Sequence, residues 1–165
     1  MRRPALFLLV ALIAVSAAFI AVTAGQLPGL VASHFDSGSG VNGWMTRNQY
    51  LFWMLALAIL LPLVIVGFLA LIPRAAPRLI NLPHRAYWLS EARREQTLAT
   101  LLSFGCAQGA VLTVFAAALH YVILQANTTA PPQLPGVLFV AVLAGLLAAM
   151  AAWTIALYVR FRHVD

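Results

Sequence analysis

The chain has 165 residues, of which 63% are hydrophobic and only 8% are charged. Soluble domains carry roughly a quarter charged residues, so this composition excludes an ordinary soluble domain and predicts an integral membrane protein. The formal net charge is +6 and every basic residue is an arginine. The positions of these arginines along the chain, described below, argue against nucleic-acid binding.

Four uncharged apolar runs are long enough to cross a bilayer. A hydrocarbon core about 30 Å thick takes roughly 20 helical residues to cross, and lipid offers no partner to irregular backbone, so each run is expected to be a helix. The runs cover residues 5–24, 50–72, 101–124 and 137–159. We therefore expect an all-α integral membrane protein, with residues 1–165 forming a single four-span membrane domain.

The first run has an alternative interpretation as a cleaved signal peptide. Two arginines precede it, and its end resembles a small-residue cleavage site, Ala21-Val22-Thr23-Ala24. The run is long for a signal peptide, however, and its removal would leave three spans and strand the C-terminal arginines outside. The sequence favours a retained span.

Residues 26–49 form a polar segment between the first two spans. Their most distinctive members are Leu27-Pro28, His34-Phe35-Asp36, a Ser/Gly stretch over 37–40, Gly43-Trp44 and Arg47. In an extended backbone His34 and Asp36 share a face because they are two residues apart.

In the following span, Pro62 removes a backbone donor and is expected to kink the helix.

Nine of the ten arginines fall on one side of the predicted membrane. They are Arg2 and Arg3 before the first span, Arg74, Arg78, Arg85, Arg93 and Arg94 between the second and third, and Arg160 and Arg162 after the fourth. The positive-inside rule makes this side cytoplasmic. We therefore expect a bacterial cytoplasmic (inner) membrane protein with both termini in the cytoplasm and the 26–49 segment outside, where Arg47 is the only basic residue.

The cytoplasmic connection, residues 73–100, is rich in arginine. Tyr87 and Trp88 are expected at the headgroup level, as an aromatic belt, and Ser90 is a plausible N-cap for a helix that continues into the third span. The surface formed by Arg78, Arg85, Arg93 and Arg94 is best interpreted as a topology signal that meets anionic headgroups. Docking of a cytoplasmic protein partner is the alternative.

Small residues recur at four-residue spacing in the last two spans, at Gly105 and Gly109 and at Ala141, Gly145 and Ala149. This spacing lets helix backbones approach closely in lipid. It suits packing within the bundle, with homodimer formation as the competing use. Cys106 is the only cysteine, so no disulfide framework or cysteine metal cluster is expected.

Three interpretations of the outer segment compete. In the structural one, Asp36 pairs with Arg47, His34 bonds to the loop and Trp44 anchors the chain at the interface. In the second, His34, Asp36 and His120 bind a metal, for which zinc is suited to imidazole and carboxylate ligands. In the third, an ordered outer lid recognises a ligand. No catalytic site is expected, because the sequence shows no placed nucleophile for a Ser-His-Asp hydrolase. A proton-driven transporter is disfavoured, because the predicted spans hold none of the acidic groups that form proton relays. No cofactor other than zinc is expected.

The motif Leu27-Pro28, His34-Phe35-Asp36, Gly43-Trp44 and Arg47 resembles the bacterial membrane family called domain of unknown function 1648, which also forms the N-terminal part of the SdpI immunity protein. A second stretch is similar to longer members: Asn81-Leu82-Pro83, Tyr87-Trp88-Leu89, Arg93-Arg94 and Thr97. The resemblance covers roughly residues 27–97. It departs from the family pattern at Ala32, where proline is common, at Ser39, where a glycine is usual, and at Arg47, where lysine is commoner.

The resemblance implies a non-enzymatic receptor or immunity protein. It implies recognition of an extracytoplasmic peptide or envelope component through the 26–49 segment, and signal transduction through a partner on the cytoplasmic face. The ligand-binding residues would be His34, Phe35, Asp36, Trp44 and Arg47. The alternative is a small transporter or metal-binding membrane protein that uses His34, Asp36 and His120.

Overall fold

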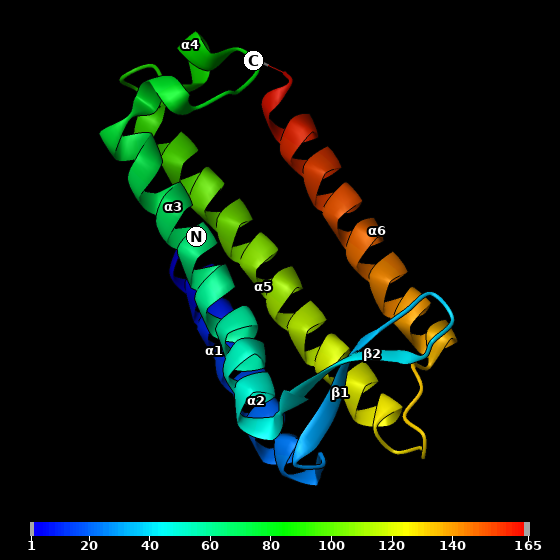
Figure 1. Cartoon of the computed structure of the whole chain (residues 1–165). Helices are drawn as coiled ribbons and strands as arrows, with labels where there is room; N and C mark the ends of the chain where they lie inside the picture. The colour runs from blue at the N-terminus through cyan, green and yellow to red at the C-terminus, as the bar shows by residue number, and fades with distance from the viewer. Residues whose placement is uncertain (1, 164–165) are drawn as a thin grey trace.

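The computed structural model describes residues 2–163, and at positions 2, 3, 73, 74 and 77 it describes the backbone alone. Four helical segments are long and apolar enough to span a membrane. They are α1 (Arg2–Thr23), the continuous segment of α2 (Arg47–Leu55), η2 (Ala56–Leu60) and α3 (Leu61–Ala75), then α5 (Arg94–Ala126) and α6 (Gly136–Phe161), as Figure 1 shows. The predicted multi-pass helical architecture is confirmed.

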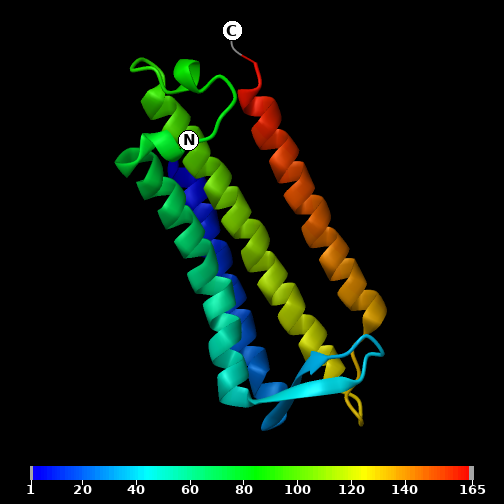
Figure 2. The same cartoon turned by 45° about the horizontal axis from the view of Figure 1, so that its top comes forward.

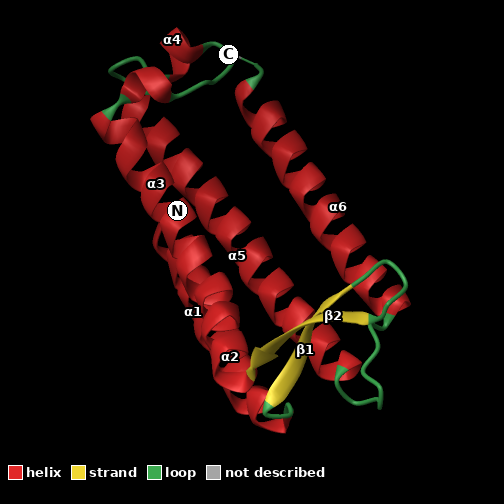
Figure 3. Cartoon of the chain, viewed as in Figure 1, coloured by secondary structure: helices red, strands yellow, loops and turns green. Residues whose placement is uncertain are grey.

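The expectation of an all-α fold is wrong in one place. Residues predicted as a loop form two antiparallel strands, β1 (Leu30–Phe35) and β2 (Val41–Thr46), which follow a short 3-10 turn η1 (Ala24–Gln26). Figure 3 shows this hairpin crossing one end of the helices. We call this end, residues 27–46 and 127–135, the hairpin end.

The opposite end holds the connection between α3 and α5 and the last residues described, and we call residues 76–93 and 160–163 the arginine end (Figures 1 and 2). The connection contains η3 (Pro77–Leu79) and α4 (Arg85–Trp88). The prediction that Ser90 is the N-cap of this helix is wrong, because α5 begins at Arg94. The Ser90 hydroxyl instead donates to the carbonyl of Tyr87, and the Ser90 carbonyl accepts from the amides of Arg93 and Arg94.

Three of the helical segments pack into a bundle, whereas α6 packs mainly along α5 and meets α4 at its C-terminal end. One core cluster, between α1, α2 and α5, contains Ile20, Tyr50, Met54, Ala116 and Ile123. A second cluster packs Val66 of α3 against Leu9, Ile13 and Cys106. By contrast, no residue in the most apolar stretch of α6 is buried. Figure 2 shows α6 set off from the other three along most of its length.

The glycines of α5 are used within the bundle. A Cβ on Gly105 would lie 2.8 Å from Leu69 Cδ1, and one on Gly109 would lie 3.3 Å from side-chain carbons of Leu9 and Pro62. Gly145 of α6, however, has nothing within 4 Å of its Cβ position. The α5 glycines therefore serve intrachain packing, and only the α6 small residues are left for the homodimer interpretation.

Close to Pro62, where the sequence predicts a kink, the helix contains a π-helical turn. The turn η2 ends two residues before Pro62, which is fully buried at the start of α3. Proline has no amide to donate to the carbonyl four residues earlier, which is that of Ala58. The Thr113 hydroxyl donates to this carbonyl at 3.4 Å, so α5 satisfies the group that Pro62 leaves without its usual partner.

Candidate functional site

The hairpin turn is organised around Asp36. Its carboxylate Oδ1 accepts hydrogen bonds from the amides of Gly38 and Gly40, both at 2.9 Å, and its own amide donates to the carbonyl of Gly40 at 2.8 Å. Ser39 adopts a φ of 67°, in the left-handed region that favours glycine. Asp36 is thus a turn-forming residue whose oxygen is occupied by the backbone.

The hairpin is tied to the bundle by Asn127, just beyond the end of α5. Its side-chain amide bonds to the backbone of Ala32 as a neighbouring strand would: Oδ1 accepts from the Ala32 amide at 2.9 Å, and Nδ2 donates to the Ala32 carbonyl at 3.0 Å. Nδ2 also donates to the carbonyl of Ile123. At the tip, the Leu134 amide donates to the Ser39 carbonyl at 3.3 Å. The hairpin is therefore held at its middle and at its tip.

One face of the hairpin is buried and the other carries exposed apolar side chains. Val31 is fully buried in the core at this end, and Phe35 and Met45 pack against the same cluster. On the other face, Leu30 and Trp44 are 55% and 48% exposed. Leu30 pairs with Thr46 and Ala32 pairs with Trp44, so Leu30 and Trp44 are diagonal cross-strand neighbours within reach of each other.

His34 is exposed and bonds within its own loop. Its Nδ1 lies 3.0 Å from the Ser33 hydroxyl oxygen. The imidazole covers Gly43, where a Cβ would lie 3.0 Å from His34 Cβ and 3.1 Å from Nδ1. His34 pairs with Gly43, and register shifts on both sides of His34 interrupt the regular alternation of the two faces. Gly43 is therefore the residue whose lack of a side chain makes room for the imidazole.

Arg47 stands at the base of the hairpin, where β2 turns into α2. Its amide donates to the carbonyl of Gly29 at 3.0 Å, and its Nε donates to the carbonyl of Pro28 at 3.5 Å. Thr46 and Gln49 form a capping box that starts α2. Arg47 thus closes the base of the hairpin on the first strand.

The expected pairing of Asp36 with Arg47 is wrong. Asp36 lies in the turn and Arg47 at the base, and strands of this length separate the two by roughly 17 Å, at about 3.3 Å per residue. The five predicted ligand-binding residues are likewise spread over the hairpin: Asp36 lies at the tip, His34 beside Gly43, Trp44 exposed on β2, Phe35 against the core and Arg47 at the base.

Beneath the hairpin lies a buried polar cluster centred on His120 of α5. His120 is fully buried; its Nε2 lies 2.8 Å from Thr23 Oγ1 and its Nδ1 lies 2.8 Å from the Tyr50 hydroxyl. The Thr23 hydroxyl donates to the carbonyl of Phe19 at 2.6 Å, so it accepts from His120 Nε2–H, and Nδ1 then accepts from Tyr50. The Phe19 ring meets the imidazole edge-on. A neutral His120 therefore joins α1, α2 and α5 with both ring nitrogens occupied.

The structure does not bring the predicted metal ligands together. His120 is enclosed by Thr23, Tyr50 and Phe19, whereas His34 and Asp36 bond to their own loop. Within residues 2–163, no three His, Cys, Asp or Glu side chains are grouped where they could hold a metal ion. His120 lies near the hairpin end of α5, but its imidazole is turned into the bundle.

At the arginine end, the predicted partner or lipid contacts lie on the connection and the start of α5. Arg93 stacks over the Tyr87 ring at 4.1 Å, and the Trp88 indole donates to the carbonyl of Phe161 at 3.0 Å. Arg78 and Arg85 are exposed, and Arg94 is half-buried. Arg160 of α6 also stacks on Trp88, a contact that could not be predicted from the sequence.

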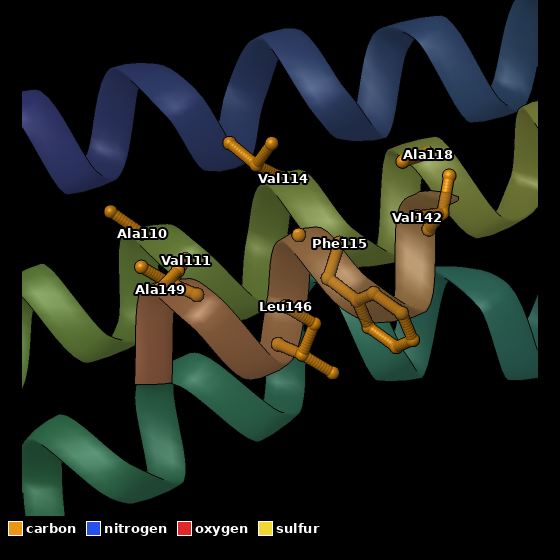
Figure 4. Close-up of a pocket in the computed structure, with 9 residues that line it drawn as sticks. Ala110, Val111, Val114, Phe115, Ala118, Val142, Leu146 and Ala149 are labelled. Atoms are coloured by element: carbon orange, nitrogen blue, oxygen red, sulfur yellow. The ribbon is translucent and has the colours of Figure 1, made fainter. Parts of the chain in front are cut away.

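A second feature that the sequence missed is an apolar groove between α5 and α6, of about 370 Å³. Figure 4 shows side chains from both helices around it. Its lining is Ala110, Val111, Val114, Phe115, Ala118, Val142, Gly145, Leu146 and Ala149. The groove follows from the small α6 residues, which leave space where α6 stands beside α5.

Searches of protein families, curated proteins and solved structures found no match to this chain.

Proposed function

We propose that the protein is a non-enzymatic recognition protein of the bacterial cytoplasmic membrane, with the hairpin outside the membrane as its binding element. The ligand class is an extracytoplasmic peptide or envelope component, as the family resemblance implies. The positive-inside rule supports this orientation, because the arginine end would then be cytoplasmic.

The observation that carries the proposal is the exposed pair of Leu30 and Trp44 on a hairpin whose other face is buried. Large apolar side chains that stay exposed in a group of neighbours mark interaction surfaces, and tryptophan is enriched among the residues that dominate binding energy. An extended peptide of complementary shape would meet Trp44 as its main anchor.

The hydrogen bonds beneath this surface favour binding. Ordering a loop on association costs free energy, but Asn127 and the Asp36 turn already hold the hairpin backbone. The buried His120 cluster joins three helices below it. The surface is thus presented on a supported scaffold, and little ordering is left for the ligand to induce.

Site-specific photo-crosslinking tests the proposal. Benzoylphenylalanine in place of Trp44 is expected to give a discrete non-lipid adduct in cells that produce the full chain. The matched control is the same substitution at Phe52, an exposed aromatic residue on α2, which is expected to give lipid adducts only.

A Leu30→Ser change is expected to reduce the adduct at position 44 without altering the one at position 52. If position 44 yields only the lipid adducts seen at position 52, then Trp44 is an interfacial anchor and the recognition proposal is wrong.

A further inference from the structure

A polar pocket at the arginine end lies between α4, α5 and α6. Its volume is about 200 Å³, and its lining consists of two arginines, two aromatic residues and two uncharged polar residues: Arg93, Arg160, Tyr87, Trp88, Gln96 and Thr97. No acidic side chain contributes to this lining. The pocket therefore concentrates positive charge at one point of the surface.

The two guanidinium groups are stacked on aromatic rings. Arg93 Cζ lies 4.1 Å from the centre of the Tyr87 ring, and Arg160 Cζ lies 4.9 Å from that of Trp88. Among residues 2–163, neither guanidinium has a hydrogen-bond or ion-pair partner. Stacking occupies the flat face of a guanidinium and leaves the N–H groups at its edge available.

The aromatic frame that positions these arginines is itself fixed. The Trp88 indole N–H donates to the carbonyl of Phe161 at 3.0 Å, and the Thr97 hydroxyl donates to the carbonyl of Trp88 at 2.7 Å. Phe161 is almost fully buried and meets Trp88 edge-on. The pocket is thus preorganised by contacts that join α4, α5 and α6.

A mostly apolar groove of about 300 Å³ continues from this pocket between α5 and α6. It is lined by Gln96, Ala99, Thr100, Ser103, Phe104 and Arg160, so it shares Gln96 and Arg160 with the polar pocket. The hydroxyls of Thr100 and Ser103 donate to carbonyls of their own helix. From Gln96 to Phe104 the groove follows α5 for about 12 Å, at 1.5 Å per residue.

At the far end of the groove, Phe104 is bonded to Trp153 of α6. Its indole donates to the carbonyl of Phe104 at 2.8 Å, and its ring meets the Phe104 ring edge-on. A ligand that fits both spaces has an anionic head for the arginines and an apolar tail for the groove.

We propose that Arg93 and Arg160 bind the phosphate of an anionic phospholipid whose acyl chain enters the groove between α5 and α6. Arginine donates paired N–H groups to phosphate oxygens. Free phosphate would satisfy the arginines and leave the groove without an occupant, so the adjoining groove favours a lipid.

Native mass spectrometry of the full chain in mild detergent tests this proposal. The probes are phosphatidylglycerol, phosphatidylcholine with the same acyl chains, and inorganic phosphate. The wild-type protein is expected to retain phosphatidylglycerol about tenfold more tightly than phosphatidylcholine, and the double change Arg93→Gln with Arg160→Gln is expected to abolish that preference. The matched control, Arg78→Gln with Arg162→Gln, removes the same charge from the same end and is expected to keep it.

A Ser103→Trp change fills the groove and leaves both arginines in place, so it is expected to weaken phosphatidylglycerol retention. If the Arg93/Arg160 glutamine pair does not fold, the lysine pair replaces it, and a smaller lipid preference is expected because the planar fork is lost. Equal losses in the two glutamine pairs, an unchanged preference in the Arg93/Arg160 variants, or displacement of the lipid by an equal concentration of inorganic phosphate would overturn the proposal.

Discussion

The two ends of the molecule use their polar side chains in opposite ways. At the hairpin end and directly beneath it, Asp36, Asn127 and His120 are bonded to groups of the chain itself, and the large apolar side chains that stay exposed are Leu30 and Trp44. At the arginine end, Arg93 and Arg160 are stacked on rings with their donors unbonded to other residues that the structure describes. The polar side chains at the first end stabilise the backbone of the hairpin and the helices beneath it, whereas the two arginines at the second end are the groups that we propose bind a phospholipid.

The strongest test of this contrast is removal of the buried imidazole. His120→Leu leaves the Tyr50 hydroxyl without its acceptor and Thr23 without its donor, so a loss of about 2 kcal/mol in unfolding free energy is expected. Unfolding of the detergent-solubilised protein measures it. His34→Leu is the control, since it removes an exposed imidazole and is expected to leave the unfolding free energy almost unchanged. Equal effects of the two changes would contradict a structural role for His120.

Asn127→Ala should loosen the hairpin without unfolding the bundle. The change removes three hydrogen bonds, two of them to Ala32 in β1, and we expect about 1–2 kcal/mol less protection of the strand amides. Hydrogen exchange over residues 30–35 measures this, with Asn48→Ala at an exposed position as the control. Exchange in these amides that matches the wild-type protein would show that Asn127 does not hold the hairpin.

Gly43→Ala tests the packing of His34 on the hairpin. The new methyl group would lie 3.0 Å from His34 Cβ, so the imidazole must shift, at a cost of about 1 kcal/mol. Adding His34→Ala to the same chain removes the ring atoms Nδ1 and Cγ, at 3.1 and 3.2 Å, but keeps Cβ at 3.0 Å, so it should recover part of this loss. Thermal unfolding of the two variants measures the recovery, and no recovery would mean that the backbone rather than the ring is displaced.

The smallest expected effect is at the turn. Ser39 has a positive φ, so Ser39→Gly should relieve strain and raise the unfolding free energy by up to about 0.5 kcal/mol. Ser37, two residues earlier, has no positive φ, so Ser37→Gly is expected to be neutral or slightly destabilising. The same thermal unfolding measurement compares them, and a destabilised Ser39→Gly chain would argue against strain at this residue.

The helices could be predicted from the sequence because lipid imposes a simple rule of length and hydropathy. The hairpin was harder to predict. The Asp36–Gly40 turn signal is clear, but the strands beside it are short and interrupted by a register shift near His34, so alternation is weak. The start of α5 was misplaced because Ser90, a good capping residue, is used to close a preceding turn instead.

The contacts that define the site were beyond sequence reasoning because they join distant residues. His120 meets Tyr50 and Thr23 across 70 and 97 residues. The only available signal was a histidine inside an otherwise apolar span, which marks an interior position without naming its partners. The pairing of Arg160 with Trp88 likewise depends on where α6 ends against α4.

Cysteine labelling in intact cells is the measurement that tests the outer recognition hairpin most directly. Cys106 is buried, so an Asn42→Cys change on exposed β2 and an Arg78→Cys change at the arginine end can be compared against a low background. We expect a membrane-impermeant maleimide to label position 42 in intact cells and position 78 only after permeabilisation. Labelling in the reverse order would put the hairpin inside the cell and contradict the proposed function.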